Sequence, residues 1–287
     1  MTTDDTGCEV VTTRSGARAM RDRETGELMH PVVGPLVEAQ KLYVDASQLE
    51  GRLGRWAPEP LILLDVGLGA GSNAIAAWKL SERMPASSRR LEVISFDRTT
   101  AALELALSDP HAAAFGFVGD ALRAARALLS EGRYETPRTV WRFQAGELPA
   151  ALSCVPERSS DVVFWDPFSP RANAALWTTA AFAALRRACA EGATVHTYSA
   201  ATAVRSALLL AGFAVGVGAP SGVGKDTTQA AVDFRALDRP LDRRWLERLA
   251  RSAAPFPTDA PAEAMARIAA LSQFSVETPV DARPALP

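Results

Sequence analysis

The stretch Leu61–Asn73, LILLDVGLGAGSN, constrains the fold more than any other part of this chain. Its four leading apolar residues predict a strand buried on both faces of a parallel sheet. Asp65 follows, and then come three glycines at alternate positions: Gly67, Gly69 and Gly71. Ser72 and Asn73 are suited to cap the next helix. Together these parts predict a cradle for a nucleotide-like ligand, because glycine lets the backbone approach closely and unpaired N–H groups point outward.

The spacing of the glycines narrows the choice of ligand. A dinucleotide fingerprint, G-x-G-x-x-G, requires glycine at position 72, where this chain has Ser72. The chain instead has D-x-G-x-G-x-G, which resembles the first motif of class I S-adenosylmethionine methyltransferases. The alternative is a glycine-rich turn in some other parallel-sheet protein, and the glycines alone do not exclude it.

A second buried strand, LEVISF at 91–96, ends in Asp97. An acid at the end of the second strand is placed to contact ribose hydroxyls, which favours a nucleoside-containing cofactor. The alternative is that Asp97 is the N-cap of a helix that begins near Thr99.

Strand and helix alternate through the rest of the central part, with further strands expected at 139–144, 161–165, 193–198, 213–217 and 229–235. This alternation predicts an α/β fold with a Rossmann-like, doubly wound, mostly parallel sheet. We expect seven strands, and the methyltransferase resemblance implies that the last two form a terminal antiparallel hairpin.

The flanking segments differ in composition from the central part. We expect residues 1–12 to be disordered and residues 13–55, which glycine and proline interrupt, to form a small β-rich cap with a brief helix at 34–40. Residues 56–238 are the predicted methyltransferase domain, and 239–287 a helical, proline-rich extension. The segment from Arg235 to Arg251 contains six arginines, these two included. They lie either on a helix that faces phosphate groups or on an ordinary charged helix face, and we favour the second interpretation.

Composition limits the class of partner and the compartment. Lys and Arg number 31 against 33 Asp and Glu, which argues against indiscriminate nucleic-acid coating. Three scattered cysteines contain no C-x-x-C, so we expect no metal site and no disulfide framework. No apolar run approaches the roughly 18 residues of a membrane span, and the N-terminus lacks a signal-peptide core. We therefore expect a cytoplasmic protein.

Acidic residues follow the predicted strands at the edge where open parallel sheets bind ligands: Asp65, Asp97, Glu147 and Asp166. Asp166 begins D-P-F-S-P, which resembles the [DN]-P-P-[FY] element of amine methyltransferases, although Phe168 replaces the second proline of that element. An amine attacks a methyl group only as a neutral lone pair, and a carboxylate can orient it and accept a proton. An ordinary Asp-Pro turn is the alternative.

Longer segments identify a family. DVVFWDPFSPRANAALWT (161–178) resembles the D-x-x-[FL]-D-[GAP]-F-[AS]-P-x-x-N-P-x-[LM]-W-[TS] signature of the tRNA 5-methylaminomethyl-2-thiouridine methyltransferases, the MnmC/MnmD type. GELMHPVVGPLVEAQKLYVDASQL (26–49) is similar to that family's G-E-x-Y-H-S-x-x-G-A-x-x-E-[SA]-x-x-V-F segment. The resemblance covers roughly residues 11–235 and includes the GVGK of 222–225.

The resemblance implies methyl transfer from S-adenosylmethionine to the aminomethyl nitrogen of a wobble uridine in tRNA. It implies that Asp166 faces the amine and that Asn173 and Trp177 brace the loop that carries Asp166. On the cofactor side, the resemblance implies that the methionine end is held by Gly67, Gly69, Gly71 and Asn73. Asp97 would contact the ribose and Glu147 the adenine region, and Asp65 belongs to the same set. The alternative role of Glu147 is helix capping. The substrate side would comprise His30, Phe168, Asn173 and Lys225.

Several residues depart from the family pattern. Pro31 replaces serine, Ala174 replaces proline, Glu147 replaces the commoner aspartate, and Asp226 replaces a second basic residue. Lys225 is either a phosphate contact or a solvated loop lysine. We expect no fused flavin oxidase domain, because no second nucleotide fingerprint follows residue 235. Two alternatives remain for the function. The protein could methylate another nucleoside or a small amine, or it could bind the cofactor without catalysis. The oligomeric state does not follow from the sequence.

Overall fold

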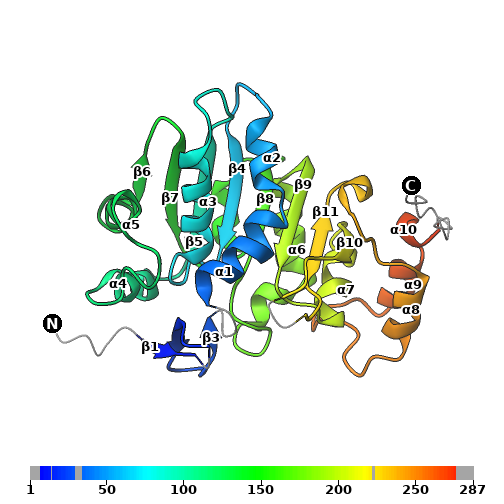
Figure 1. The fold of residues 1–287 in the computed structure, drawn as a ribbon. Helices are drawn as coiled ribbons and strands as arrows, with labels where there is room; N and C mark the ends of the chain where they lie inside the picture. Colours follow the sequence, from blue (N-terminus) through cyan, green and yellow to red (C-terminus); the bar gives the residue numbers. More distant parts are fainter. Residues whose placement is uncertain (1–6, 14, 30–33, 222–223, 276–287) are drawn as a thin grey trace, which may run out of the picture.

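Two β-sheets organise the described part of the chain (Figure 1). The computed structural model describes residues 7–13, 15–29, 34–221 and 224–275. The large sheet has the strand order β10-β11-β9-β8-β4-β5-β7-β6. The strands from β9 to β7 in that order run parallel, and the strands at the two ends are antiparallel. The strand bounds are β4 Leu61–Val66, β5 Leu91–Asp97, β6 Arg133–Glu135, β7 Thr139–Ala145, β8 Ser160–Trp165, β9 Cys189–Thr197, β10 Ala214–Val217 and β11 Thr228–Ala231.

The α/β, mostly parallel sheet and its terminal antiparallel hairpin, β10–β11, are confirmed. The strand count is corrected from seven to eight, because β6 turns back onto β7 and pairs Tyr134 with Trp141. β6 has three residues, which is too short to show a period-2 pattern in the sequence.

Helices cover both faces of the large sheet, as doubly wound folds require. Successive residues of β4 show this, since Leu63 belongs to one buried cluster and Leu64 to the other. The first cluster is closed by α1 Pro35–Ala39, α2 Leu49–Gly54, α3 Ser72–Arg83, α4 Ala101–Leu107 and α5 Asp120–Glu131. The second is closed by α6 Thr179–Ala188, α7 Thr202–Leu210, α8 Arg243–Ala250, α9 Ala264–Ala269 and α10 Ser272–Ser275.

The small sheet lies below the large one in Figure 1 and confirms the β-rich cap. Its antiparallel strands are β1 Cys8–Thr12, β2 Arg18–Asp22 and β3 Leu28–Met29. The expected disorder of residues 1–12 is therefore wrong over β1, which pairs with β2 along its length and forms the ion pair Glu9–Arg21. A strand that gains its stability from a partner elsewhere in the chain shows little local signal.

The segment after the small sheet carries more helix than expected. Beyond α1 the chain continues as a π-helix, η1 Gln40–Asp45, and α2 follows. This segment buries Leu42, Tyr43 and Val44. Short 3-10 helices occur at η2 Ala150–Cys154, η3 Ala174–Trp177 and η4 Phe234–Ala236.

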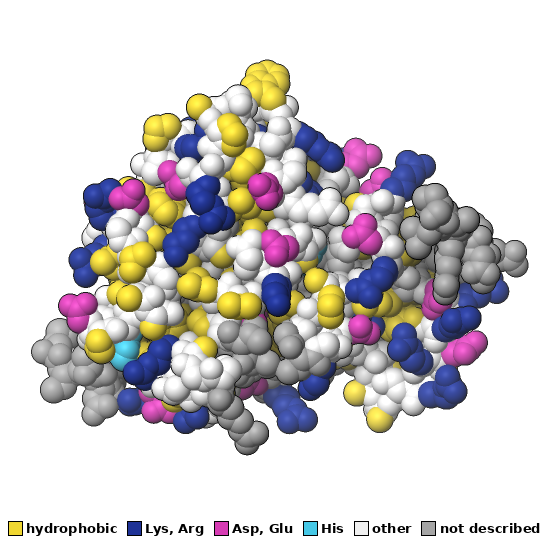
Figure 2. Space-filling view, viewed as in Figure 1, with side chains coloured by type: hydrophobic (Ala, Val, Ile, Leu, Met, Phe, Trp, Pro, Cys, Tyr) yellow, Lys and Arg dark blue, Asp and Glu magenta, His cyan; other side chains and the backbone are white. Residues whose placement is uncertain are grey.

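The C-terminal helices flank the β10 end of the sheet in Figure 1. α8 buries Trp245 and Leu249 and leaves its arginines exposed. Figure 2 shows Lys and Arg side chains on this flank with acidic side chains among them. The predicted domain boundaries remain predictions. None of the helices in the described ranges is long and apolar enough to span a bilayer.

Candidate active site

The glycine turn joins β4 to α3 and lies against the loop that follows β8. Gly67 has φ +89°, and a Cβ there would lie 2.7 Å from the backbone oxygen of Asp166. Gly69 has φ +49°, and its N–H donates to Asp97 Oδ2 at 3.0 Å. Gly71 packs against α4 instead, since a Cβ there would lie 3.0 Å from Leu103 Cδ1. The turn therefore needs its glycines for close approach on both sides.

The start of α3 differs from the prediction that Ser72 and Asn73 cap it. The N-cap is Gly71, and both polar residues lie in the first helical turn. They are 2% and 3% exposed, and within the described chain Ser72 Oγ and Asn73 Oδ1 have no hydrogen-bond partner. Both residues line a cavity. Buried polar atoms are normally paired, so this pair indicates a ligand in that cavity.

The cavity has a volume of about 970 Å³ and lies at the carboxyl ends of β4, β5, β7 and β8. This volume is within the range of small-molecule sites, about 300–1,000 Å³. The small sheet, the loop after β8 and the loop before β11 complete its wall. Most of the predicted site residues line it: Gly67, Gly69, Asn73, Asp97, Glu147, Asp166, Phe168, Asn173 and Lys225.

Three predicted residues do not belong to this lining as the structure describes it. His30 lies outside the described residues. Gly71 faces α4. Asp65 is 1% exposed and accepts a hydrogen bond from Ser95 Oγ at 2.6 Å, and Ser95 in turn accepts one from Trp141 Nε1 at 3.0 Å. Asp65 therefore ties β4 to β5 beneath the turn.

Asp97 and Glu147 stand at neighbouring strand ends. Asp97 accepts from Gly69 and from the N–H of Arg98 at 2.7 Å. Burial raises the pKa of the Asp97 carboxyl above its ordinary 3.8, and these backbone N–H groups oppose the rise. The N-cap of α4 is Thr100, so the capping alternative for Asp97 is wrong. The Glu147 side chain is 75% exposed and lies 3.7 Å from Arg98.

The Asp166 carboxylate is held by donors from two different elements. Tyr43 of η1 donates its hydroxyl to Oδ1 at 2.6 Å, and Asn73 of α3 donates Nδ2 to Oδ2 at 2.7 Å. Burial, and next the charge of Asp166, raises the pKa of both the Tyr43 and the Tyr198 phenols, which keeps them protonated. Asn73 therefore also positions the acid through its amide nitrogen, and its predicted role at the methionine end of the cofactor stays a prediction.

The loop after β8 is fixed at successive residues. Trp177 Nε1 donates to the Phe168 carbonyl at 2.8 Å, which agrees with its predicted bracing role. Tyr198 donates its hydroxyl to the Pro167 carbonyl at 3.1 Å. Glu27 of the small sheet region accepts the N–H of Ser169 at 2.9 Å and also its hydroxyl. Asp166 therefore sits on a rigid support.

Sequence reasoning missed Tyr43, Glu27 and Tyr198. Glu27 and Tyr43 lie within the segment 26–49 that resembles the family, but the pattern does not show which residues they contact. Their partners, Ser169 and Asp166, are 142 and 123 residues away in the chain.

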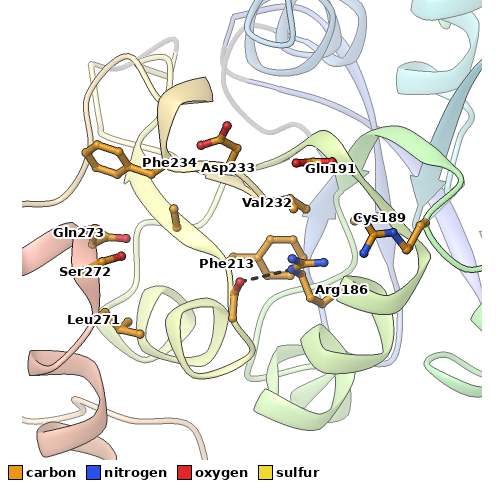
Figure 3. Close-up of a pocket in the computed structure, with 13 residues that line it drawn as sticks. Arg186, Cys189, Glu191, Phe213, Val232, Asp233, Phe234, Leu271, Ser272 and Gln273 are labelled. Carbon is orange, nitrogen blue, oxygen red and sulfur yellow. Dashed lines mark hydrogen bonds between the residues drawn. The ribbon is translucent and has the colours of Figure 1, made fainter.

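A second cavity, of about 520 Å³, lies at the opposite edge of the sheet, beside the amino ends of β9 and β10 (Figure 3). Arg186 lies 5.8 Å from the centre of the Phe213 ring and donates Nε to the Gly212 carbonyl at 3.3 Å. The amide of Gln273 bonds to the backbone of Val215 and Leu241. These polar groups are paired within the protein, and none of the described residues that line this cavity has a buried polar side-chain atom without a partner.

The fold and the first cavity define a Rossmann-like methyltransferase. A model of the S-adenosyl-L-methionine-dependent methyltransferase family matches residues 128–233. The chain belongs to the MnmC-type S-adenosyl-L-methionine-dependent methyltransferase family.

Individual relatives agree with this assignment. The tRNA 5-methylaminomethyl-2-thiouridine biosynthesis bifunctional protein MnmC of Methylibium petroleiphilum is 31% identical over 77% of this chain and 34% of its own length. The protein of the same name from Burkholderia vietnamiensis is 31% identical over 67% of this chain and 30% of its own length. The crystal structure of MnmC2 from Aquifex aeolicus has a TM-score of 0.71 and 26% identity, and covers 92% of this chain and 84% of its own. The chain spans about a third of the length of these bifunctional relatives.

The first cavity fits S-adenosyl-L-methionine. The glycine turn permits close backbone approach, Ser72 and Asn73 present unpaired oxygens, and Asp97 presents a carboxylate at the second strand end. When bound, this cofactor supplies an electrophilic methyl group. Among the described residues, no group of three or more His, Cys, Asp and Glu is arranged to hold a metal ion.

Proposed function

We propose that the chain transfers a methyl group to the aminomethyl nitrogen of 5-aminomethyl-2-thiouridine at the wobble position of tRNA. The observation that carries this proposal is the Asp166 carboxylate, held by Tyr43 and Asn73 beside the glycine turn in the large cavity. The names of the relatives support the choice of substrate. A tRNA substrate also favours a cytoplasmic location.

In this proposal Asp166 acts on the amine. An alkyl ammonium has no lone pair, so the nitrogen must lose a proton before it attacks. A fixed carboxylate orients the nitrogen through a hydrogen bond and accepts a proton from it, and the C–N bond then forms as the methyl–sulfur bond breaks. Tyr43 and Asn73 each donate to one oxygen of the carboxylate and so hold it in a fixed position.

The proposal also assigns recognition of the nucleotide. An anticodon base must leave its stack to reach a cavity, where aromatic faces can support it. Phe168 lines the cavity two residues beyond Asp166 and is half-buried. Lys225 is exposed at the cavity wall, where an ammonium group suits a phosphate.

A second candidate is methylation of a small cationic amine. The charged residues that line the described part of the cavity favour it, because acids outnumber Arg98 and Lys225: Asp22, Glu24, Glu27, Glu38, Asp97, Glu147, Asp166 and Asp226. Such a lining attracts cations and repels a polyphosphate backbone.

The test is incubation of the protein and S-adenosyl-L-methionine with tRNA that carries 5-aminomethyl-2-thiouridine, followed by mass analysis of the nucleosides. We expect one added methyl group on that nucleoside alone. The matched controls are the free nucleoside, a panel of small amines, and tRNA that lacks the aminomethyl group. Methylation of small amines without tRNA methylation would favour the second candidate, and no methylation of any amine would refute both.

A further inference from the structure

Tyr43 is a buried tyrosine whose hydroxyl reaches the proposed catalytic acid. It lies in the π-helix η1, is 0% exposed, and packs its ring against Phe164 with the centroids 5.3 Å apart. π-helical turns occur frequently at functional sites. The ring packs without help from the hydroxyl, so the hydroxyl needs its own explanation.

The hydroxyl donates to Asp166 Oδ1 at 2.6 Å, and the backbone of Tyr198 also hydrogen-bonds to it. A short bond from a hydroxyl to an ionised acceptor is among the stronger hydrogen bonds in proteins. Because Asn73 binds the other oxygen, the two donors together fix both the position and the plane of the carboxylate. They also favour its charged form over its protonated form.

We infer that Tyr43 is a positioning residue that holds Asp166 ionised and oriented toward the amine. The inference rests on the proposed function, since it assigns the acid its role there. The structure thus adds to the site a residue that the family pattern does not specify.

The test compares Tyr43→Phe with Tyr134→Phe. Tyr134 lies on β6, outside the cavity lining, with its ring 6.5 Å from that of Trp78. Loss of the bond to a charged group is expected to lower kcat for the amine about tenfold in Tyr43→Phe, with cofactor affinity unchanged. Tyr134→Phe is expected to keep the wild-type kcat and KM.

A merely structural role would not change the acidity of Asp166, so its titration is the decisive readout. With ¹³C-labelled aspartate and Asp166 assigned by difference from Asp166→Asn, we expect its pKa to rise by about one unit in Tyr43→Phe, because the lost donor favoured the charged form. Other titratable groups around it in the described lining are Tyr198, Glu27, Glu38, Asp97, Lys225 and Asp226. These groups are the same in the wild type and in Tyr43→Phe.

The outcomes separate this inference from the proposed function. Absence of methyl transfer by the wild type would refute the proposed function, while the titration would still test the Tyr43–Asp166 bond. Unchanged kcat and an unchanged Asp166 pKa in a folded Tyr43→Phe would overturn the inference alone. If Tyr43→Phe does not fold, 3-fluorotyrosine at position 43 keeps the shape and strengthens the donor. The pKa of Asp166 must then fall below its wild-type value, and a pKa that does not move refutes the inference.

Discussion

The two cavities lie at opposite edges of one sheet and differ in what their polar groups contact. At the carboxyl edge, Ser72 Oγ and Asn73 Oδ1 are buried without partners in the described chain, and the backbone turns at positive φ beside them. At the amino edge, Arg186 and Gln273 bond to backbone carbonyls, and Arg186 also covers Phe213 (Figure 3).

This difference shows why one edge suits a ligand. The parallel strands direct their carboxyl ends, and the loops that follow them, toward the same edge. The structure leaves polar atoms unpaired there, which costs folding free energy unless a ligand pairs with them. The described residues that line the cavity at the amino edge include no buried polar side-chain atom without a partner, so nothing there indicates a ligand.

The largest effect is expected at Asp166. Asp166→Asn keeps the shape of the side chain but removes its proton-accepting charge, so kcat should fall about 10³-fold while cofactor affinity stays unchanged. Asp120→Asn, an exposed aspartate at the start of α5, is the control. Steady-state kinetics with a methylated-product assay measures the effect, and a folded Asp166→Asn with wild-type turnover would remove Asp166 from the mechanism.

The next effect is expected at the glycine turn. In Gly67→Ala the Cβ would lie 2.7 Å from the Asp166 oxygen at φ +89°, so we expect a loss of stability of about 1–3 kcal/mol. The displaced turn should also weaken cofactor binding at least about tenfold. Calorimetry and thermal unfolding measure both, with Gly192→Ala, which has open space around it, as the control. Wild-type affinity in Gly67→Ala would show that the turn does not form the cofactor site.

A pH-dependent effect is expected at Asp97. Burial raises the pKa of the Asp97 carboxyl, so in the free protein this group becomes protonated at a higher pH than an ordinary aspartate. As the pH falls through the raised pKa, the charged carboxylate that would bind the ribose hydroxyls is lost. Cofactor affinity of the wild type should therefore fall with decreasing pH in that range.

Folding stability should change in the opposite direction. The native state binds this proton more readily than the unfolded chain, so the contribution of Asp97 to stability rises as pH falls from the raised pKa toward 3.8. In Asp97→Asn both dependences should disappear, and affinity should be about tenfold weaker at neutral pH. Titration calorimetry across pH measures this, and identical pH profiles in the two proteins would contradict it.

The smallest effect is expected at the amino edge. Arg186→Ala should leave cofactor affinity and kcat at wild-type values and cost about 0.5–1 kcal/mol of stability through the lost contact with Phe213. Chemical denaturation and kinetics check this. A clear loss of turnover in Arg186→Ala would mean that the two edges are functionally coupled.

Local sequence signals were sufficient for the centre of the fold. The apolar run of β4, the glycine turn and α3 lie within one continuous stretch, and β5 and β8 show the same buried-strand pattern. The methyltransferase class and its cofactor followed from these and from the family segments.

Long-range pairing was not available from sequence. The Tyr43–Asp166 and Glu27–Ser169 contacts join residues more than a hundred positions apart, and no local pattern shows that these pairs meet. Aromatic residues on a buried helical face predict core packing, which Tyr43 also provides. β1 and β6 depend on β2 and β7 for their pairing, so their short sequences did not identify them.

The most direct measurement is a crystal structure with bound S-adenosylhomocysteine. We expect this ligand in the cavity at the carboxyl edge, with its homocysteine part over Gly67 and Gly69, its ribose hydroxyls on Asp97 and its sulfur directed toward Asp166. A ligand bound at the other edge, or one with its sulfur turned away from Asp166, would contradict this account.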